Sequence, residues 1–371
     1  MPEKKKAFKD WFDSAAANAM SHQIKSVWPQ FNESRFVAIA LRNLDDLEFH
    51  DRVGNFSLGL ARCLPSDVPR ALEILRESLP EPMENCEDVT DGWLQWPVGR
   101  FIADNGVPYF EESMRAMVEL TKRFTSEFAV RPFLVQRTDE TIQRLYRLTE
   151  DENPHVRRWC SEGTRPRLPW GVRLPAFIND PSPLYPIIKK LWNDPEEYVR
   201  RSVANSMNDI SRDNPHETLN LCQEIRSASH PMSERVLKRG LRTLIKDGNA
   251  DALALIGYSN PKNVECLLSL KPAVVAIGNS VDMSITLKNN SSSQQDLLVD
   301  YSVTFPRKNG RSSTKVFKGT SIQLAARHSE TILKKHPMRR TTVRELYAGT
   351  HIIQILVNGK VLGVDSFELL V

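Results

Sequence analysis

Residues 151–158, DENPHVRR, and residues 194–201, DPEEYVRR, carry the same short motif when one gap is allowed. In each copy an acidic turn is followed by Val-Arg-Arg, which opens a segment with helical periodicity. The two valines, Val156 and Val199, are 43 residues apart. A repeat of this length predicts a stack of two-helix units, because one helix pair alone cannot bury its apolar face.

The repeat extends in both directions along the chain. SERVLKRGLRTL at 233–244 continues it, with Val236 a further 37 residues on, and SEFAVRPFLV at 126–135 is a shorter, earlier relative. We therefore predict an all-α HEAT-like helical-repeat solenoid over residues 1–266, whose second helices line a concave wall. Apolar residues at spacings of three and four predict helices in segments 36–47, 68–79, 110–124, 140–151 and 233–248.

The pattern changes near residue 267. Alternating β-branched and polar residues, separated by NNSSSQQ, RKNG and NGK, are typical of strands and hairpins. About seven short strands over residues 267–371 predict an all-β immunoglobulin-like sandwich. This span contains no cysteine, so we expect no disulfide between its sheets. The clearest strand segments are 274–290, 297–305, 350–359 and 365–371.

Composition excludes several classes of protein. The 371 residues are 40% hydrophobic and 26% charged, which is typical of a globular protein. No apolar run reaches the roughly 18 residues that a membrane span needs, and MPEKKKAFKDWF lacks the apolar core of a secretory signal. Five cysteines without C-x-x-C spacing favour a reducing compartment, the bacterial cytosol or nucleoid. We find no nucleotide-binding loop or H-E-x-x-H motif and expect no metal or organic cofactor.

The charge is unevenly distributed. Residues 1–152 carry 19 Lys and Arg against 26 Asp and Glu, whereas residues 153–246 carry 16 against 10 and residues 267–371 carry 14 against 7. Two basic segments after an acidic one indicate an oriented electrostatic face and a polyanionic partner. Similar differences in charge between segments also occur in soluble proteins that bind no polyanion, so the charge distribution alone does not establish a polyanionic partner.

Residues 155–171, HVRRWCSEGTRPRLPWG, hold two tryptophans, four arginines and one glutamate. Val156 to Gly163 can be helical after Asn153-Pro154, and the prolines that follow predict an extended loop. Guanidinium groups match the geometry of phosphate, and a tryptophan face can stack on a base or sugar. The stretch therefore favours contact with nucleic acid.

Three segments, SEFAVRPFL (126–134), NPHVRRWCSEGTRPRLPW (153–170) and YVRRSVANSMNDISRDNP (198–215), resemble the AlkC family of DNA alkylation repair glycosylases, HEAT-like proteins related to the AlkD group. The β-rich segment resembles the immunoglobulin-like domain at the end of some members. The resemblance implies hydrolytic removal of 3-methyladenine and 3-methylcytosine from double-stranded DNA by a monomer. It also implies action on a nucleotide that stays largely in the duplex.

By this resemblance the catalytic candidates are Glu127, Glu162 and Asp209, carboxylates that would stabilise positive charge on the sugar and orient a water. Methylation at N3 already makes the base a cation, so the leaving group needs no proton from the protein. No lysine in the motifs stands out as a Schiff-base nucleophile, so we expect a monofunctional enzyme. The DNA-binding candidates are Trp170, Trp159, Arg158, Arg165, Arg167, Arg201, Lys308 and Arg311.

Each candidate has a structural alternative. Glu162 could pair with Arg158, Asp209 with Arg212, and Glu127 could interact with a helix dipole. Trp159 fits a core as well as a groove, and Arg157 and Arg200 fit pairing between repeats as well as a functional role. The hairpin that carries Lys308 and Arg311 could simply be solvated.

Two other functions stay open. A non-enzymatic HEAT scaffold for proteins would not need aligned carboxylates, and a lesion-binding protein would recognise alkylated DNA without releasing the base. Base release from a methylated duplex, compared between wild type and Glu162→Gln, separates the three possibilities.

Overall fold

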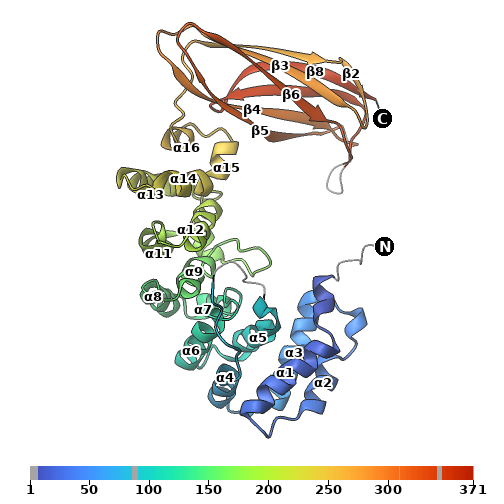
Figure 1. The fold of residues 1–371 in the computed structure, drawn as a ribbon, viewed down its shortest axis with the longest axis vertical. Helices are drawn as coiled ribbons and strands as arrows, with labels where there is room; N and C mark the ends of the chain where they lie inside the picture. The colour runs from blue at the N-terminus through green and yellow to red at the C-terminus, as the bar shows by residue number, and fades with distance from the viewer. Residues whose placement is uncertain (1–6, 86–90, 309, 341–344, 371) are drawn as a thin grey trace. The chain divides into compact units, whose positions relative to one another are not determined.

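The structure, a computed structural model, describes residues 7–85, 91–308, 310–340 and 345–370. It divides into two compact units, Met1–Asn214 and Pro215–Val371, which are described in turn (Figure 1). The first six residues, Cys86 and Val371 lie outside the described residues. Within the described ranges no helix is long and apolar enough to cross a bilayer.

The first unit is built from helices joined by loops, as the periodicity predicts. Each of the four helical segments predicted in this unit, 36–47, 68–79, 110–124 and 140–151, overlaps an observed helix. Helices pair and stack: α8 packs on α9, α11 on α12, and α9 on α12 of the next pair. The helices are α1 (Ser14–Val27), α2 (Glu33–Ala40), α3 (Phe49–Cys63), α4 (Val68–Glu77), α5 (Trp96–Asn105), α6 (Phe110–Thr121), α7 (Arg131–Gln136), α8 (Thr138–Leu148), α9 (Pro154–Glu162), α10 (Pro175–Asn179), α11 (Tyr185–Leu191) and α12 (Glu197–Ile210). Short 3-10 helices occupy Phe8–Trp11, Leu44–Asp46, Asp91–Gln95 and Ser182–Leu184.

The repeated Val-Arg-Arg motif has the same structural role at the start of α9 and α12. Val156 and Val199 are fully buried between the helices. The first arginine of each motif turns back to the acidic turn before its own helix. Arg157 Nη1 donates to the carbonyl oxygens of Asp151 and Glu152 at 3.0 and 2.9 Å, and Arg200 Nη1 donates to those of Asp194 and Pro195.

This first arginine also explains how neighbouring repeats are joined. Arg157 makes a two-point ion pair with Asp194, the acid of the next turn, at 2.7 and 3.1 Å. The arginine thus binds carbonyls of the turn that precedes the helix, and its ion pair with Asp194 links this turn to the next one.

The second unit begins with four helices, α13 (Pro215–Ser227), α14 (Ser233–Gly240), α15 (Arg242–Lys246) and α16 (Ala250–Leu255). Residues 233–248, predicted as one helical segment, form two helices because the helix ends at Gly240 and a new one starts after Leu241.

Eight strands follow in the described residues, one more than predicted. They form two sheets of order β1-β3-β6 and β2-β8-β7-β4-β5, in which only the short β2–β8 pair is parallel. Alternate residues of β3, among them Val281, Met283 and Ile285, enter the core between the sheets. The strands are β1 (Val264–Lys271), β2 (Val274–Ala276), β3 (Ser280–Asn289), β4 (Gln295–Pro306), β5 (Ser312–Leu324), β6 (Ser329–Pro337), β7 (Gly349–Val357) and β8 (Lys360–Leu370).

The first strand starts at Val264, ahead of the predicted change at residue 267. It therefore includes Cys266, so the prediction that the β-rich part holds no cysteine is wrong. Cys266 is a free thiol whose pKa is raised to about 11 by burial. The sandwich is held by its apolar core and its strand pairing.

Candidate active site

Five charged side chains of the first unit form a continuous chain of ion pairs. Arg158 lies between Glu127 and Glu162, with Nη1–Oε2 and Nη2–Oε1 distances of 2.7 and 3.7 Å. Arg165 lies between Glu162 and Asp209, with Nη1–Oε1 and Nε–Oδ2 distances of 2.6 and 2.8 Å. The three acids implied by the resemblance are thus brought to one place, linked by two guanidinium groups.

Three repeats contribute to this chain. Glu127 stands in the turn before α7, Arg158 and Glu162 lie one turn apart on α9, and Asp209 is near the end of α12. Arg165 follows α9 and reaches the next repeat. Because α9 packs directly on α12, residues 44 positions apart meet without any long connection. The alternative pairing of Asp209 with Arg212 is not the one found: the hydrogen bond to Asp209 comes from Arg165.

Burial and charge act in opposite directions on the two most buried acids. Burial opposes the ionisation of Glu162, but Arg158 and Arg165 outweigh it and hold the pKa of this carboxyl below its usual range. Burial raises the pKa of Asp209 by more than Arg165 and Arg212 lower it, and the negative Glu162 adds to the rise. The site therefore holds one carboxyl that favours the charged form and a second that binds a proton more readily than usual.

The loop after α9 is compact, so the prediction of an extended loop is wrong. Gly171 N donates to Leu168 O and Leu174 N to Pro166 O, both at 3.1 Å. Arg165 turns inward to its two carboxylate partners on α9 and α12. Trp170 is left at the surface, 69% exposed, with a left-handed φ of 64°. A large residue in that conformation is strained, which is more common at functional positions than elsewhere.

Trp170 forms one wall of a cavity of about 360 Å³. Trp96 stacks on Phe128 with ring centroids 5.1 Å apart, and Trp170 lies 6.5 Å from Trp96 at an interplanar angle of 28°. Thr125 and Arg131 are polar residues of the lining. Trp96 is half-buried and lines this cavity. An aromatic-walled cavity of this kind accepts a flat ring or a sugar face.

Several residues predicted to contact DNA are engaged elsewhere. Trp159 is fully buried in the core, so it has no face to offer a ligand. Arg158 and Arg165 are largely buried and bound to carboxylates, which corrects their assignment as phosphate contacts. Arg167 makes a two-point pair with Asp213 at 2.8 and 2.7 Å. Arg201, with a side chain 53% exposed and Glu197 at 3.6 Å, can still reach a phosphate.

Arg131 is a site residue that sequence reasoning missed. Its Nη1 donates to the carbonyl oxygens of Gly163 and Arg165 at 3.1 Å each, and its Nε donates to that of Val172. Its position in the repeat could have identified it, since Val130-Arg131 corresponds to Val156-Arg157.

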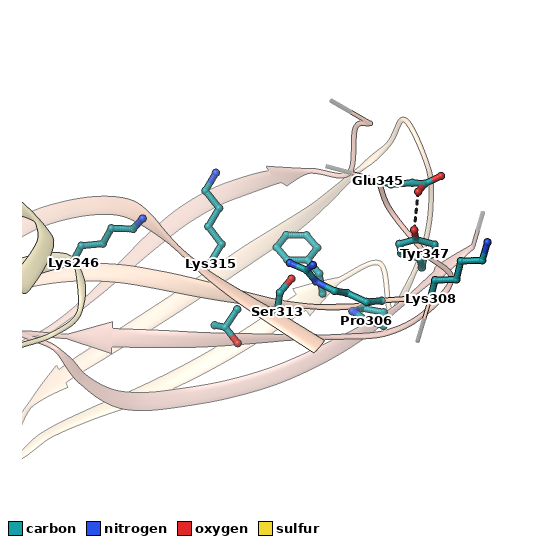
Figure 2. A pocket seen from close by; sticks show the side chains of 10 residues that line it. Lys246, Pro306, Lys308, Ser313, Lys315, Glu345 and Tyr347 are labelled. Carbon is teal, nitrogen blue, oxygen red and sulfur yellow. Dashed lines mark hydrogen bonds between the residues drawn. The ribbon is translucent and has the colours of Figure 1, made fainter. Parts of the chain in front are cut away.

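In the second unit, Lys308 and Arg311 lie on either side of the tip of the β4–β5 hairpin. Lys308 is part of a second cavity of about 690 Å³, with Lys246 and Lys315 around it and Tyr347 donating to Glu345 at 2.7 Å (Figure 2). This cavity is open and basic, so it fits an anionic group rather than an apolar ligand.

Two further features concern possible metal ligands and the thiol nearest to the ion-pair chain in sequence. Among the residues that the structure describes, no group of three or more His, Cys, Asp and Glu side chains is placed to hold a metal ion. Cys160, beside the ion-pair chain in sequence, is fully buried, and burial raises the pKa of its thiol, which disfavours a thiolate nucleophile.

Comparison with known proteins places this arrangement in a family. Residues 124–243, which include the whole ion-pair chain, match the family model described as DNA alkylation repair enzyme. Pseudomonas fluorescens alkylpurine DNA glycosylase AlkC, solved bound to DNA containing an abasic site analog, superposes with a TM-score of 0.89 and 32% identity, over 99% of this chain and 100% of that one. The chain belongs to the AlkC family.

Both units of this AlkC-family chain have counterparts in known proteins. Residues 265–371 match the model described as the C-terminal Ig-like domain of YhaZ. The Bacillus subtilis (strain 168) protein YhaZ is 34% identical over 355 residues, which cover 95% of this chain and 96% of that protein. The predicted helical repeats followed by an immunoglobulin-like domain are therefore confirmed as an AlkC-type architecture.

Proposed function

We propose that this AlkC-family protein is a monofunctional DNA glycosylase that hydrolyses the N-glycosidic bond of cationic N3-methylated bases, 3-methyladenine and 3-methylcytosine, and so starts base excision repair. The single observation that carries the proposal is the linked set Glu127, Glu162 and Asp209, which Thr125, bonded to Glu127, connects to the cavity that the exposed Trp170 lines. The solved AlkC relative, bound to DNA, supports DNA as the partner.

The chemistry follows from charge. When the bond between C1′ and the base nitrogen breaks, its electron pair neutralises the methylated base, and positive charge develops on the deoxyribose. Glu162, whose pKa is held below the usual range, supplies a carboxylate to stabilise that charge. Water then forms the new C1′–O bond and gives its proton to Asp209, whose raised pKa suits a general base. Neither step requires a cofactor.

DNA binding would combine two kinds of contact. Trp170 stacks on the lesion nucleotide or its sugar, while Arg201, Lys308 and Arg311 contact phosphates. That the base stays largely in the duplex is a finer part of the proposal, which the family resemblance supports. A 2-aminopurine placed beside the lesion tests it: a large fluorescence rise on binding an uncleavable duplex would show that the base is extruded.

The decisive experiment incubates duplexes containing 3-methyladenine or 3-methylcytosine with wild type and Glu162→Gln. Base release by wild type that is lost in the variant supports the enzyme. Binding without release would instead identify a lesion-binding protein, and neither binding nor release would favour a protein scaffold. Product strands that break only after alkali treatment would establish monofunctional chemistry; strands already cut by the protein would overturn it.

A further inference from the structure

The arginine that follows the repeat valine is used differently in α7 than in the two later copies. Arg157 and Arg200 each bind carbonyls of the turn immediately before their own helix. Arg131 instead reaches forward by 32 to 41 residues, to the loop that follows α9. In α9 and α12 this arginine binds the turn before its own helix, whereas in α7 it binds the loop of the candidate active site.

Arg131 holds both ends of this loop, residues 163–172. Nη1 binds the carbonyls of Gly163 and Arg165 where the loop begins, and Nε binds that of Val172 where it ends. Gly171 packs on the same side chain, since a Cβ there would lie 3.3 Å from the Cδ and Nε atoms of Arg131. The loop residues that matter to the site, Arg165 and Trp170, lie between these anchor points.

Stability alone is a poor reason for an arginine at this position. The residue is 2% exposed, and Nη2 has no hydrogen-bond partner. The ion pairs among the described residues do not include it, although Glu127 and Asp209 are close enough to act on its charge. Burial and the charge of Arg165 lower the pKa of its guanidinium to about 10. A buried cation that binds only carbonyls, with both N–H groups of Nη2 left over, is an unfavourable way to fill a core.

We propose that Arg131 is a positioning residue: by fixing both ends of loop 163–172 it sets Trp170 against the aromatic-walled cavity and Arg165 between Glu162 and Asp209. The role rests on the proposed function, because it is exerted on residues assigned to the lesion site. Arg131 itself need not touch the DNA.

The test uses two variants and a matched control. Arg131→Lys keeps the charge but loses the multi-point binding of carbonyls, whereas Arg131→Gln loses both. Arg115→Gln is the control, since Arg115 on α6 has 66% of its side chain exposed and pairs with Glu112. We expect both Arg131 variants to lower single-turnover base release by roughly 10²-fold, as a displacement of about 1 Å in a site does, and the control to leave it unchanged. Full activity of Arg131→Lys would overturn the proposal.

A double-variant cycle asks whether Arg131 acts through the loop. If it does, Arg131→Lys combined with Trp170→Ala should lower release by little more than the more damaging single change, because the two disturb one interaction. Losses that multiply would show that Arg131 acts independently of Trp170 and would overturn the proposed route.

Hydrogen exchange separates failure of this inference from failure of the proposed function. The amides of Gly171 and Leu174 are bonded within the loop, to Leu168 and Pro166, and report its closure without any substrate. Faster exchange at both amides in Arg131→Lys, beyond any change shared with the rest of the unit, supports the role of Arg131 even if no base is released. Unchanged exchange there overturns that role, whatever the activity.

Discussion

Arg165 Nε lies 2.8 Å from Asp209 Oδ2, which joins the loop after one repeat helix to the end of the next. The same guanidinium binds Glu162 at 2.6 Å. The spacing between two candidate catalytic acids is therefore set by one side chain and by the packing of α9 on α12. Changes that shift this stacking would disturb the site without touching any of its residues.

Replacing Glu162 by Gln should lower single-turnover base release by about 10²- to 10³-fold, the usual effect of removing one well-placed group that stabilises transition-state charge. Folding should weaken by roughly 1–3 kcal/mol, because Arg158 and Arg165 lose part of their compensation. Urea unfolding and release from a 3-methylcytosine duplex measure the two effects. Glu150→Gln, which removes an exposed ion pair with Lys190, is the control and should change neither. Comparable release by Glu162→Gln and wild type would exclude Glu162 from the chemistry.

The two tryptophans of residues 155–171 should respond in opposite ways. Trp159→Phe should lower the free energy of unfolding by about 1–3 kcal/mol, since it changes a fully buried side chain, and should leave base release nearly intact. Trp170→Ala should leave stability nearly unchanged and weaken binding to an abasic-sugar duplex by the roughly 1–3 kcal/mol of one stacking interaction. Thermal unfolding and a binding titration on the same samples check both. Tight binding by Trp170→Ala would remove Trp170 from the DNA interface.

The sequence was sufficient for the architecture, because a repeat fixes which helices stack, whereas the choice of the three acids came from the resemblance to the AlkC family. The sequence could not show which arginines pair with carboxylates and which remain available to bind phosphate. Arginine is a common phosphate ligand, but in the structure Arg158 and Arg165 are paired with the three nearby carboxylates. Trp159 is buried with the inner face of α9, whereas the exposure of Trp170 depends on how the loop closes, which we assign to Arg131, 32 or more residues away.

Arg157→Met should destabilise the fold without impairing catalysis. It leaves Asp194, a carboxylate with 4% of its side chain exposed, without its two-point partner and frees two carbonyls. A loss of about 3 kcal/mol is expected, as for other buried pairs broken on one side. Arg100→Met, which removes an exposed pair with Asp104, should lower stability by no more than about 0.5 kcal/mol. Equal urea midpoints for the two variants would contradict the structural role of Arg157.

If the basic cavity of the second unit binds the DNA backbone, removing its lysines should weaken the salt dependence of DNA affinity. Lys308→Ala with Lys315→Ala should lower the slope of log K against log salt by about 0.9 for each DNA phosphate that is no longer neutralised, so by up to roughly 2. Substitution is preferable to truncation at residue 267, which would cut through β1. The control pair, Lys288→Ala with Lys360→Ala, removes two exposed lysines outside the cavity. An unchanged slope in the first double variant would show that this cavity does not bind the DNA backbone.

The opposite shifts of Asp209 and Glu162 predict how activity and stability depend on pH. The pKa of Asp209 is raised above its usual 3.8, so base release should fall first through protonation of Asp209 as the pH is lowered. Glu162, with its lowered pKa, stays charged to more acidic pH. For stability the signs differ: Glu162 stabilises the fold above the usual carboxyl pKa and loses this effect as pH falls through its lowered value. Asp209 favours the fold only at pH low enough to protonate it.

Asp209→Asn separates these effects. The variant should have a lower plateau rate and should lack the acid limb assigned to Asp209, while the stability that Glu162 contributes above the usual carboxyl pKa should persist. Single-turnover release of 3-methylcytosine, followed from neutral pH downward together with urea unfolding at each pH, provides both curves. The alkylated base carries its charge without a proton, so a limb that persists in Asp209→Asn would have to come from another group, and Asp209 would lose its assignment as the base.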